Sequence, residues 1–164
     1  MSDPIGRSKA LLDGARYLTL ATTGADGPWA STVNFVALRG PLRLVWYSLR
    51  SARHSRNIAA HPEISASIFM TGLPGFGLDG AQLTGVCVTV EDVTEEFHRR
   101  FYELVAPDEA VRAQLALPRE EFAGDGPRRF YQLEVRRWWL LDIDRWLADK
   151  HDTRFEVSRA PELP

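Results

Sequence analysis

Hydrophobic and polar residues alternate along most of the chain, a pattern typical of β-strands that bury one face. Between Trp29 and Leu38, one face carries the odd-numbered residues, such as Val33, and the other carries the even-numbered residues, such as Asn34. Glycine, proline and aspartate cluster between these runs and predict tight turns. We expect strands at residues 17–23, 29–38, 42–48, 64–71, 82–90, 129–135 and 138–143.

Apolar residues recur at helical spacing in shorter segments between these strands. The spacing predicts helices at residues 4–15, 51–60 and 92–105, and between Pro107 and Pro118. Ser51 is the expected N-cap of the second helix. The third helix is expected to bury one stripe of side chains: Phe97, Phe101, Leu104 and Val105. Because strands outnumber helices and tight turns join them, we expect a mainly β (α+β) fold, an antiparallel barrel with helices packed outside.

Length and composition fit a single globular domain. The chain has 164 residues, of which 45% are hydrophobic and 26% are charged, values close to the average for globular proteins. A domain of this size can bury a hydrophobic core without disulfides or metal ions. We assign residues 1–147 to this domain, and residues 148–164, which are polar and end in proline-rich sequence, to a C-terminal tail.

Net charge and cysteine content narrow the classes of partner. The net charge is −2, whereas binding to nucleic acid or to a membrane surface needs a positive field. No apolar run approaches the ~20 residues of a membrane span, and the N-terminal residues lack the apolar core of a signal peptide. The single cysteine cannot form an internal disulfide or a cysteine-based metal site. We therefore expect a cytoplasmic protein that binds no nucleic acid, no membrane and no metal.

Residues 75–80 match the dinucleotide-binding motif G-x-G-x-x-G. The motif works only when its glycines open a helix whose N-terminus meets a pyrophosphate. The residues that follow alternate as in a strand, with Val86 and Val88 on one face. We therefore interpret the glycines as a hairpin loop and reject a Rossmann fold.

The segment from Tyr47 to Ile58 gathers three arginines and a histidine at the expected start of a helix: Arg50, Arg53, His54 and Arg56. Cations at a helix N-terminus are unfavourable by roughly 0.3–1 kcal/mol each, because the helix dipole is positive there. A bound phosphate would reverse this cost by accepting hydrogen bonds from Arg53, from His54 or Arg56, and from Ser51. The alternative is a solvated helix face, or arginines that pair with distant acids.

The same segment resembles the phosphate-binding segment of the pyridoxamine 5′-phosphate oxidase-like FMN-binding split barrels, through Tyr47-Ser48, Arg53-His54 and His61-Pro62. In that superfamily an Arg-Lys pair grips the FMN phosphate, and His54 here replaces the lysine. Residues 29–35 are similar to the strand that lines the isoalloxazine ring. Residues 82–85 are similar to a later strand whose glutamine reaches the cofactor from the partner subunit. The resemblance extends from about residue 17 to residue 144.

The resemblance implies an antiparallel split β-barrel of the FMN-binding type, a homodimer with its cofactor site at the interface, and a flavin-dependent oxidoreductase acting on a small molecule. The implied cofactor-binding residues are Ser31, Thr32, Val33, Asn34, Tyr47, Ser48, Ser51, Arg53, His54 and Gln82. No spacing singles out a catalytic triad, which agrees with chemistry that belongs to a cofactor.

Other functions of the same fold stay open. One is an F420-dependent reductase, whose longer cofactor tail Arg50 and Arg56 could bind. Another is a non-catalytic protein that binds flavin or heme, with His61 or His151 as the axial ligand. Oxidation of vitamin B6 is not expected, because residues 150–155 match the C-terminal substrate motif of those oxidases only with an offset of one residue.

Overall fold

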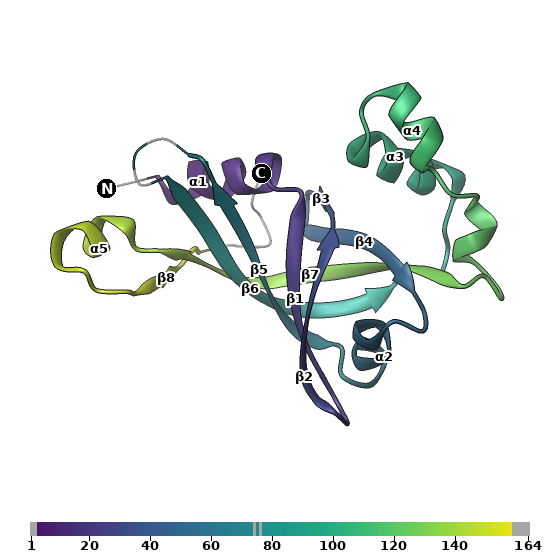
Figure 1. Ribbon diagram of the computed structural model, residues 1–164, viewed down its shortest axis with the longest axis horizontal. Coiled ribbons are helices and arrows are strands. Elements are labelled where there is room, and N and C mark those ends of the chain that lie inside the picture. Colours follow the sequence, from purple (N-terminus) through teal and green to yellow (C-terminus); the bar gives the residue numbers. More distant parts are fainter. Residues whose placement is uncertain (1–2, 74, 76, 159–164) are drawn as a thin grey trace.

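The computed structural model describes residues 3–73, 75 and 77–158 and shows one curled antiparallel sheet with helices at its margins (Figure 1). The strands are β1 (Tyr17–Gly24), β2 (Gly27–Asn34), β3 (Val36–Leu38), β4 (Arg43–Leu49), β5 (Glu63–Thr71), β6 (Leu78–Thr89), β7 (Arg128–Leu141) and β8 (Arg154–Glu156). Their order in the sheet is β2-β1-β5-β6-β7-β4-β3, and β8 pairs with β7. The expected antiparallel split barrel is confirmed.

The helices are α1 (Pro4–Gly14), α2 (Arg53–Ala60), α3 (Glu95–Val105), α4 (Glu109–Leu115) and α5 (Ile143–Asp149), with a 3₁₀ turn, η1 (Arg119–Phe122). Helices α3 and α4 form a lobe at one side of the sheet, and α1 lies across the other end of it (Figure 1). Within the described residues, no helix is both long and apolar enough to cross a membrane.

The segment expected to form one strand over residues 29–38 forms two strands instead. The chain leaves the sheet at Phe35, so that β2 pairs with β1 whereas β3 pairs with β4. These two pairings lie at opposite ends of the strand order, and the break at Phe35 therefore brings the two ends of the sheet together. The alternation of apolar and polar residues could not reveal this break. Only one residue, Phe35, leaves the sheet, and the residues on both sides of it alternate as in a continuous strand.

Residues 128–141, expected as two strands, form the single long strand β7, which bends across a bulge opposite Gly85. A Cβ on Gly85 would lie 2.1 Å from the carbonyl oxygen of Glu134, so only glycine fits at this crossing. The segment expected to be a tail from residue 148 contributes β8 to the sheet, and Val157 is buried.

The glycine-rich segment connects β5 to β6, and Leu78 already belongs to β6, so no helix follows the glycines. Gly75 and Gly77 have positive φ angles of 72° and 83°, as in a turn. Residues 74 and 76 lie outside the described residues. The expected hairpin is confirmed.

Two hydrophobic cores lie on different faces of the sheet. The larger core packs the inner face of the barrel against α1 and α2, and contains Leu18, Leu20, Trp46 and Trp138. The smaller core packs β4 and β7 against α3 and η1, and is rich in aromatic rings. On α3 the buried stripe includes Tyr102, whereas Leu104, which was expected to be buried, is 44% exposed.

Candidate functional site

A buried polar contact fixes α2 against the hairpin of β1 and β2. Asn57 Nδ2 donates to Thr22 Oγ1 at 3.0 Å, and Thr22 Oγ1 donates to the carbonyl oxygen of Trp29 at 3.3 Å. A Cβ on Gly24 would lie 2.2 Å from Asn57 Oδ1, so a larger residue at this position would displace the amide group that contacts Thr22. The start of α2 is thereby held beside Trp29 of β2.

The N-terminus of α2 has no side-chain cap. The N-cap residue is Ala52, which cannot accept a hydrogen bond, and the first turn contains no acidic residue. The expectation that Ser51 caps this helix is wrong, because the helix starts one residue later than the sequence suggests and leaves Ser51 exposed in the preceding turn. The amide groups of the first turn are therefore donors without a side-chain acceptor.

The side chains of Arg53 and Arg56, at the start of this helix, donate to backbone oxygens. The guanidinium carbon of Arg53 lies 4.4 Å from the centroid of the Trp29 ring, and Arg53 Nη2 donates to the carbonyl oxygen of Asp26 at 2.9 Å. Arg56 Nη1 donates to the carbonyl oxygen of Ser51. Within the part of the chain that the structure describes, Arg50, Arg53 and Arg56 form no ion pair with a carboxylate. Carbonyl groups do not neutralise these charges, so the region stays positive.

His54 lies in the first turn of α2, and its Nε2 is 2.8 Å from Ser48 Oγ at the end of β4. Burial lowers the pKa of the His54 imidazole below its usual range, because the charged form loses hydration. His54 is therefore mainly neutral at pH 7 and can either donate or accept a hydrogen bond. Ser48, Arg53 and His54, which the sequence proposed together, do come together at the junction of β4, α2 and the hairpin.

Tyr47 lies on the opposite face of β4 from Ser48. Its ring packs edge-on against Phe101, Phe122 and Phe130, within the smaller core. The tyrosine ring therefore supports the α3 lobe and does not face the start of α2. Sequence alone could not decide this, because adjacent strand residues face opposite sides and both sides of β4 are covered here.

Residues of β2 expected at a flavin ring divide between the two faces of the strand. Val33 is buried in the larger core and Ser31 is on the same face, whereas Thr32 and Asn34 are exposed on the outer face. The backbone groups also alternate. Gly24 pairs with Gly27 at the closed end of the hairpin, and Phe35 N donates to the carbonyl oxygen of Arg16 at the other end. In an antiparallel pair every second residue exchanges backbone hydrogen bonds with its partner, so the odd-numbered residues of β2 are the ones bonded to β1. The backbone groups of Thr32 and Asn34 therefore point to the open edge of the sheet.

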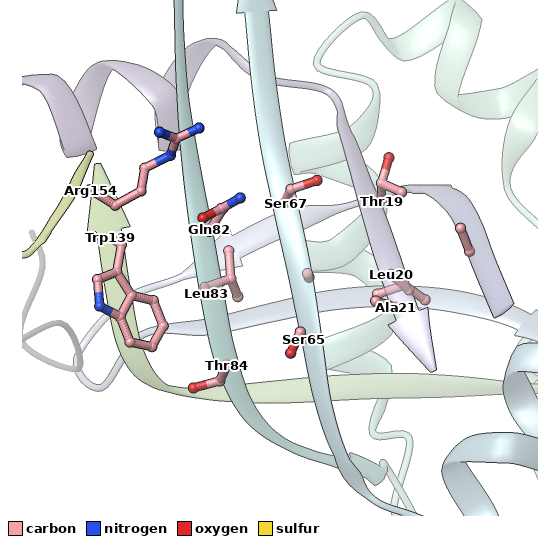
Figure 2. Close-up of a pocket in the computed structure, with 12 residues that line it drawn as sticks. Thr19, Leu20, Ala21, Ser65, Ser67, Gln82, Leu83, Thr84, Trp139 and Arg154 are labelled. Atoms are coloured by element: carbon pink, nitrogen blue, oxygen red, sulfur yellow. The ribbon is translucent and has the colours of Figure 1, made fainter. Parts of the chain in front are cut away.

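A groove of about 660 Å³ crosses the outer face of the sheet (Figure 2). Small residues line its floor, and Gln82 of β6 lies at one end with Trp139 and Arg154. Ala30 of β2 lines the groove as well. Gln82 is the one predicted site residue among those that line this groove; Ser48, Arg53 and His54 are not among them. One chain alone thus does not bring Gln82 and the start of α2 into one cavity.

The cofactor-binding residues expected from the sequence did not include Trp29, which contacts Arg53, or Trp139 and Arg154, which line the groove. Trp29 stacks on Arg53, although the two residues are far apart in sequence. Arg154 reaches the groove because β8 pairs with β7, with Leu141 opposite Arg154. No local pattern encodes these contacts; the proximity of Arg154 to the family's C-terminal substrate motif was the only available signal.

The histidines lie in different surroundings. Among the described residues, no group of three or more histidine, cysteine, aspartate or glutamate side chains converges on one point. His98 Nε2 lies 2.8 Å from the carbonyl oxygen of Leu117 and supports the α3 lobe. His61 and His151 are exposed, and neither lines the groove. Cys87 is buried, and burial raises the pKa of its thiol to about 12.

The curled antiparallel sheet, with a basic helix start beside an edge strand, defines a split β-barrel. The profile of the family described as pyridoxamine 5′-phosphate oxidase matches residues 6–142, and the chain belongs to this family. No curated protein matches the chain in sequence.

Solved structures share the fold at low identity. A heme binding protein from Mycobacterium smegmatis superimposes with a TM-score of 0.67 and 17% identity, over 99% of this chain and 61% of that protein. A FAD-binding protein from Mesorhizobium loti gives a TM-score of 0.60 at 14% identity, over 84% and 92% of the two chains. HutZ, the heme storage protein from Vibrio cholerae, gives 0.58 at 18% identity, over 80% and 89%. The fold therefore occurs in proteins described by different cofactors.

Proposed function

We propose that this protein is an FMN-dependent oxidoreductase that acts as a homodimer on a small molecule. The observation that carries the proposal is the start of α2, where uncapped amide groups, Arg53 and His54 converge and no carboxylate neutralises the arginines. A phosphate monoester matches this donor set, because it carries about two negative charges and accepts several hydrogen bonds. Trp29 holds the guanidinium of Arg53 in place, which lowers the entropy lost when a phosphate binds.

The outer edge of β2 suits the ring of the same cofactor. Thr32 and Asn34 present exposed side chains together with backbone donors and acceptors at the open edge of the sheet. A flat heterocycle with alternating donors and acceptors can pair with such an edge. When bound, a flavin supplies the electron transfer, and the residues described here hold and orient it. We assign the phosphate to Ser48, Ser51, Arg53 and His54, and the ring to the side chains and backbone groups of Thr32 and Asn34.

The proposal of a homodimer is supported by the separation of Gln82 from the start of α2 within one chain. A second copy packed on the outer face of the sheet would cover the groove and bring its Gln82 to the cofactor of the first copy. The groove has a floor of small side chains, such as Ala21, Ser65 and Ser67, which allow close approach of another surface. Exposed Tyr17 and Phe69, at 62% and 60% exposure, lie on the strands that bear this face. A symmetric dimer then contains two equivalent sites.

A flavin accounts for the site better than heme does. Heme needs an axial ligand, and no histidine is among the residues that line the groove. His54 and His98 already contact Ser48 and the carbonyl oxygen of Leu117. F420 stays the closer alternative, because Arg50 and Arg56 have no carboxylate partner among the described residues and could bind a longer anionic tail.

The proposal is tested by titrating the cofactor-free protein with FMN and with riboflavin, which lacks the phosphate. Arg53→Ala should weaken FMN binding by roughly 10- to 100-fold, the range expected for loss of a charged hydrogen bond, and should leave riboflavin binding nearly unchanged. Arg99→Ala, in which an exposed arginine of α3 loses its pair with Glu103, is the matched control. Equal FMN affinity in wild type and Arg53→Ala would reject the phosphate site. Preference for F420 over FMN would favour the alternative cofactor.

A further inference from the structure

A second pocket, of about 260 Å³, lies where the barrel meets the α3 lobe. Its lining comes from the end of α1, the bend between β2 and β3, and the end of α3. Phe35, Ala37 and Leu104 contribute apolar side chains to the lining, and Asn34, the last residue of β2, contributes a polar side chain. Leu104 was expected to be buried on α3 but is exposed, and its exposed side chain forms part of the pocket wall.

Of the two arginines that line the pocket, Arg16 has no acidic partner among the residues that the structure describes. The charged lining residues are Asp13, Arg16 and Arg39. Both oxygens of Asp13 are engaged, one by Arg39 Nη2 and the other by Lys9 Nζ, and these contacts hold the pKa of the Asp13 carboxyl below its usual range. Arg16 Nη1 donates at 3.3 Å to the carbonyl oxygen of Val105, which does not neutralise its charge. The pocket therefore combines apolar walls with an uncompensated cation.

Asn34 connects this pocket to the proposed cofactor site. Asn34 lies near one end of β2, and Trp29, whose ring contacts Arg53 of α2, lies near the other end. The side chain of Asn34 is exposed on the same face of β2 as that of Thr32. A cofactor that lies along the edge of β2 from Arg53 towards Asn34 would end beside the pocket. A small molecule in the pocket would then meet the ring of the cofactor in a place lined by both apolar and polar side chains.

We propose that the pocket between α1, the β2–β3 bend and α3 binds a small substrate that carries a carboxylate on an apolar body, and that Arg16 recognises the carboxylate. This inference rests on the proposed function for the role of the ligand as a substrate. Arg16 has two further donor groups besides the one that contacts Val105, so a carboxylate can be bound through two parallel hydrogen bonds. The apolar walls favour an aromatic or branched aliphatic body over a highly polar one.

Benzoate is a suitable probe, and benzamide is its neutral counterpart. Calorimetric titration of benzoate into the FMN-loaded and the FMN-free protein should show binding in both, and in the loaded protein benzoate should also shift the visible absorption of the flavin. Arg16→Gln should weaken benzoate binding by about tenfold or more, as expected for loss of a charged hydrogen bond. Arg16→Lys should retain part of the affinity because it keeps the charge. Benzamide should bind weakly and equally to all variants, and Arg99→Gln should behave as wild type.

The outcomes separate the two proposals. Equal benzoate affinity in wild type and Arg16→Gln, or no binding of benzoate to wild type, would overturn the carboxylate site even if FMN binds normally. Benzoate binding that depends on Arg16 in a protein that binds no flavin would overturn the proposed function and leave the carboxylate site standing. Binding to the loaded protein without any change in the flavin spectrum would overturn the role of the ligand as a substrate of the flavin.

Discussion

His54 Nε2 lies 2.8 Å from Ser48 Oγ, and this contact joins the end of β4 to the first turn of α2. Most of the groups proposed to hold the cofactor phosphate surround it. The family resemblance described above implies a lysine at this position in the related split barrels, and lysine is charged at neutral pH. A half-buried imidazole instead supplies a hydrogen bond at neutral pH and a full positive charge only in acid.

The stability of the cofactor-free protein should fall in acid partly because of His54. Burial lowers the pKa of His54 in the folded state below the value of about 6.5 that it has when unfolded. The unfolded state therefore binds a proton more readily, so stability is full above about pH 6.5 and declines as the pH falls through the folded pKa. Urea denaturation between pH 7.5 and pH 5 measures this decline. His54→Gln, which cannot titrate, should lose less stability over the same range.

The matched control for this prediction is His61→Gln, since His61 is exposed at the end of α2. That variant should follow the wild-type pH dependence. An identical decline in wild type and His54→Gln would show that protonation of His54 does not limit stability in acid.

Each cofactor site should need two copies of the chain. If Arg53 of one copy and Gln82 of the other meet one cofactor, then Arg53→Ala and Gln82→Ala should each weaken FMN binding in homodimers. A heterodimer of the two variants, purified through two different tags, contains one site with both residues intact because the dimer is symmetric. It should bind FMN at that site with wild-type affinity, as measured by fluorescence titration.

Weak binding at both sites of that heterodimer would contradict a shared site. A wild-type chain that sediments as a monomer with full FMN affinity would contradict it too. The control is a wild-type heterodimer that carries the same two tags.

A buried ion pair fastens α1 to the sheet. Arg7 Nε and Nη2 donate to the carboxylate of Asp79 at 2.8 and 2.7 Å, and Nη2 also donates to the carbonyl oxygen of Leu141 at 3.0 Å. The two side chains are only 13% and 11% exposed. Asp79→Ala should therefore cost about 3–5 kcal/mol of unfolding free energy, because it removes the carboxylate that accepts two hydrogen bonds from a largely buried guanidinium. Urea denaturation at pH 7 measures the loss.

The double variant Arg7→Met, Asp79→Leu should recover most of that stability, since an apolar pair of similar volume removes both charges together. The control pair is Arg137 and Glu156, which is well exposed and bidentate. Glu156→Ala should cost much less unfolding free energy than Asp79→Ala, because solvent screens an exposed ion pair. Similar losses for Asp79→Ala and Glu156→Ala would contradict the importance of burial.

Local patterns in the sequence determined the elements. Alternation located the strands within a few residues, the turn residues located the hairpins, and the run from Arg50 to Arg56 identified a helix start without an acidic residue. These features were predictable because a strand, a turn or a helix end depends on neighbouring residues, whose order the sequence gives directly. The strand that follows residues 75–80 excluded a dinucleotide-binding fold for the same reason.

Only the tertiary structure decided how these elements meet. The expected strand over residues 29–38 is interrupted at Phe35, and the ring of Tyr47 packs against the α3 lobe. Val33 is buried, and the guanidinium of Arg53 stacks on the ring of Trp29. The tertiary structure also added β8 to the sheet, which places Arg154 at the groove, and left Leu104 exposed beside Arg16. Each of these outcomes depends on contacts between residues distant in sequence, and the packing energy of such contacts has no local signature in the chain.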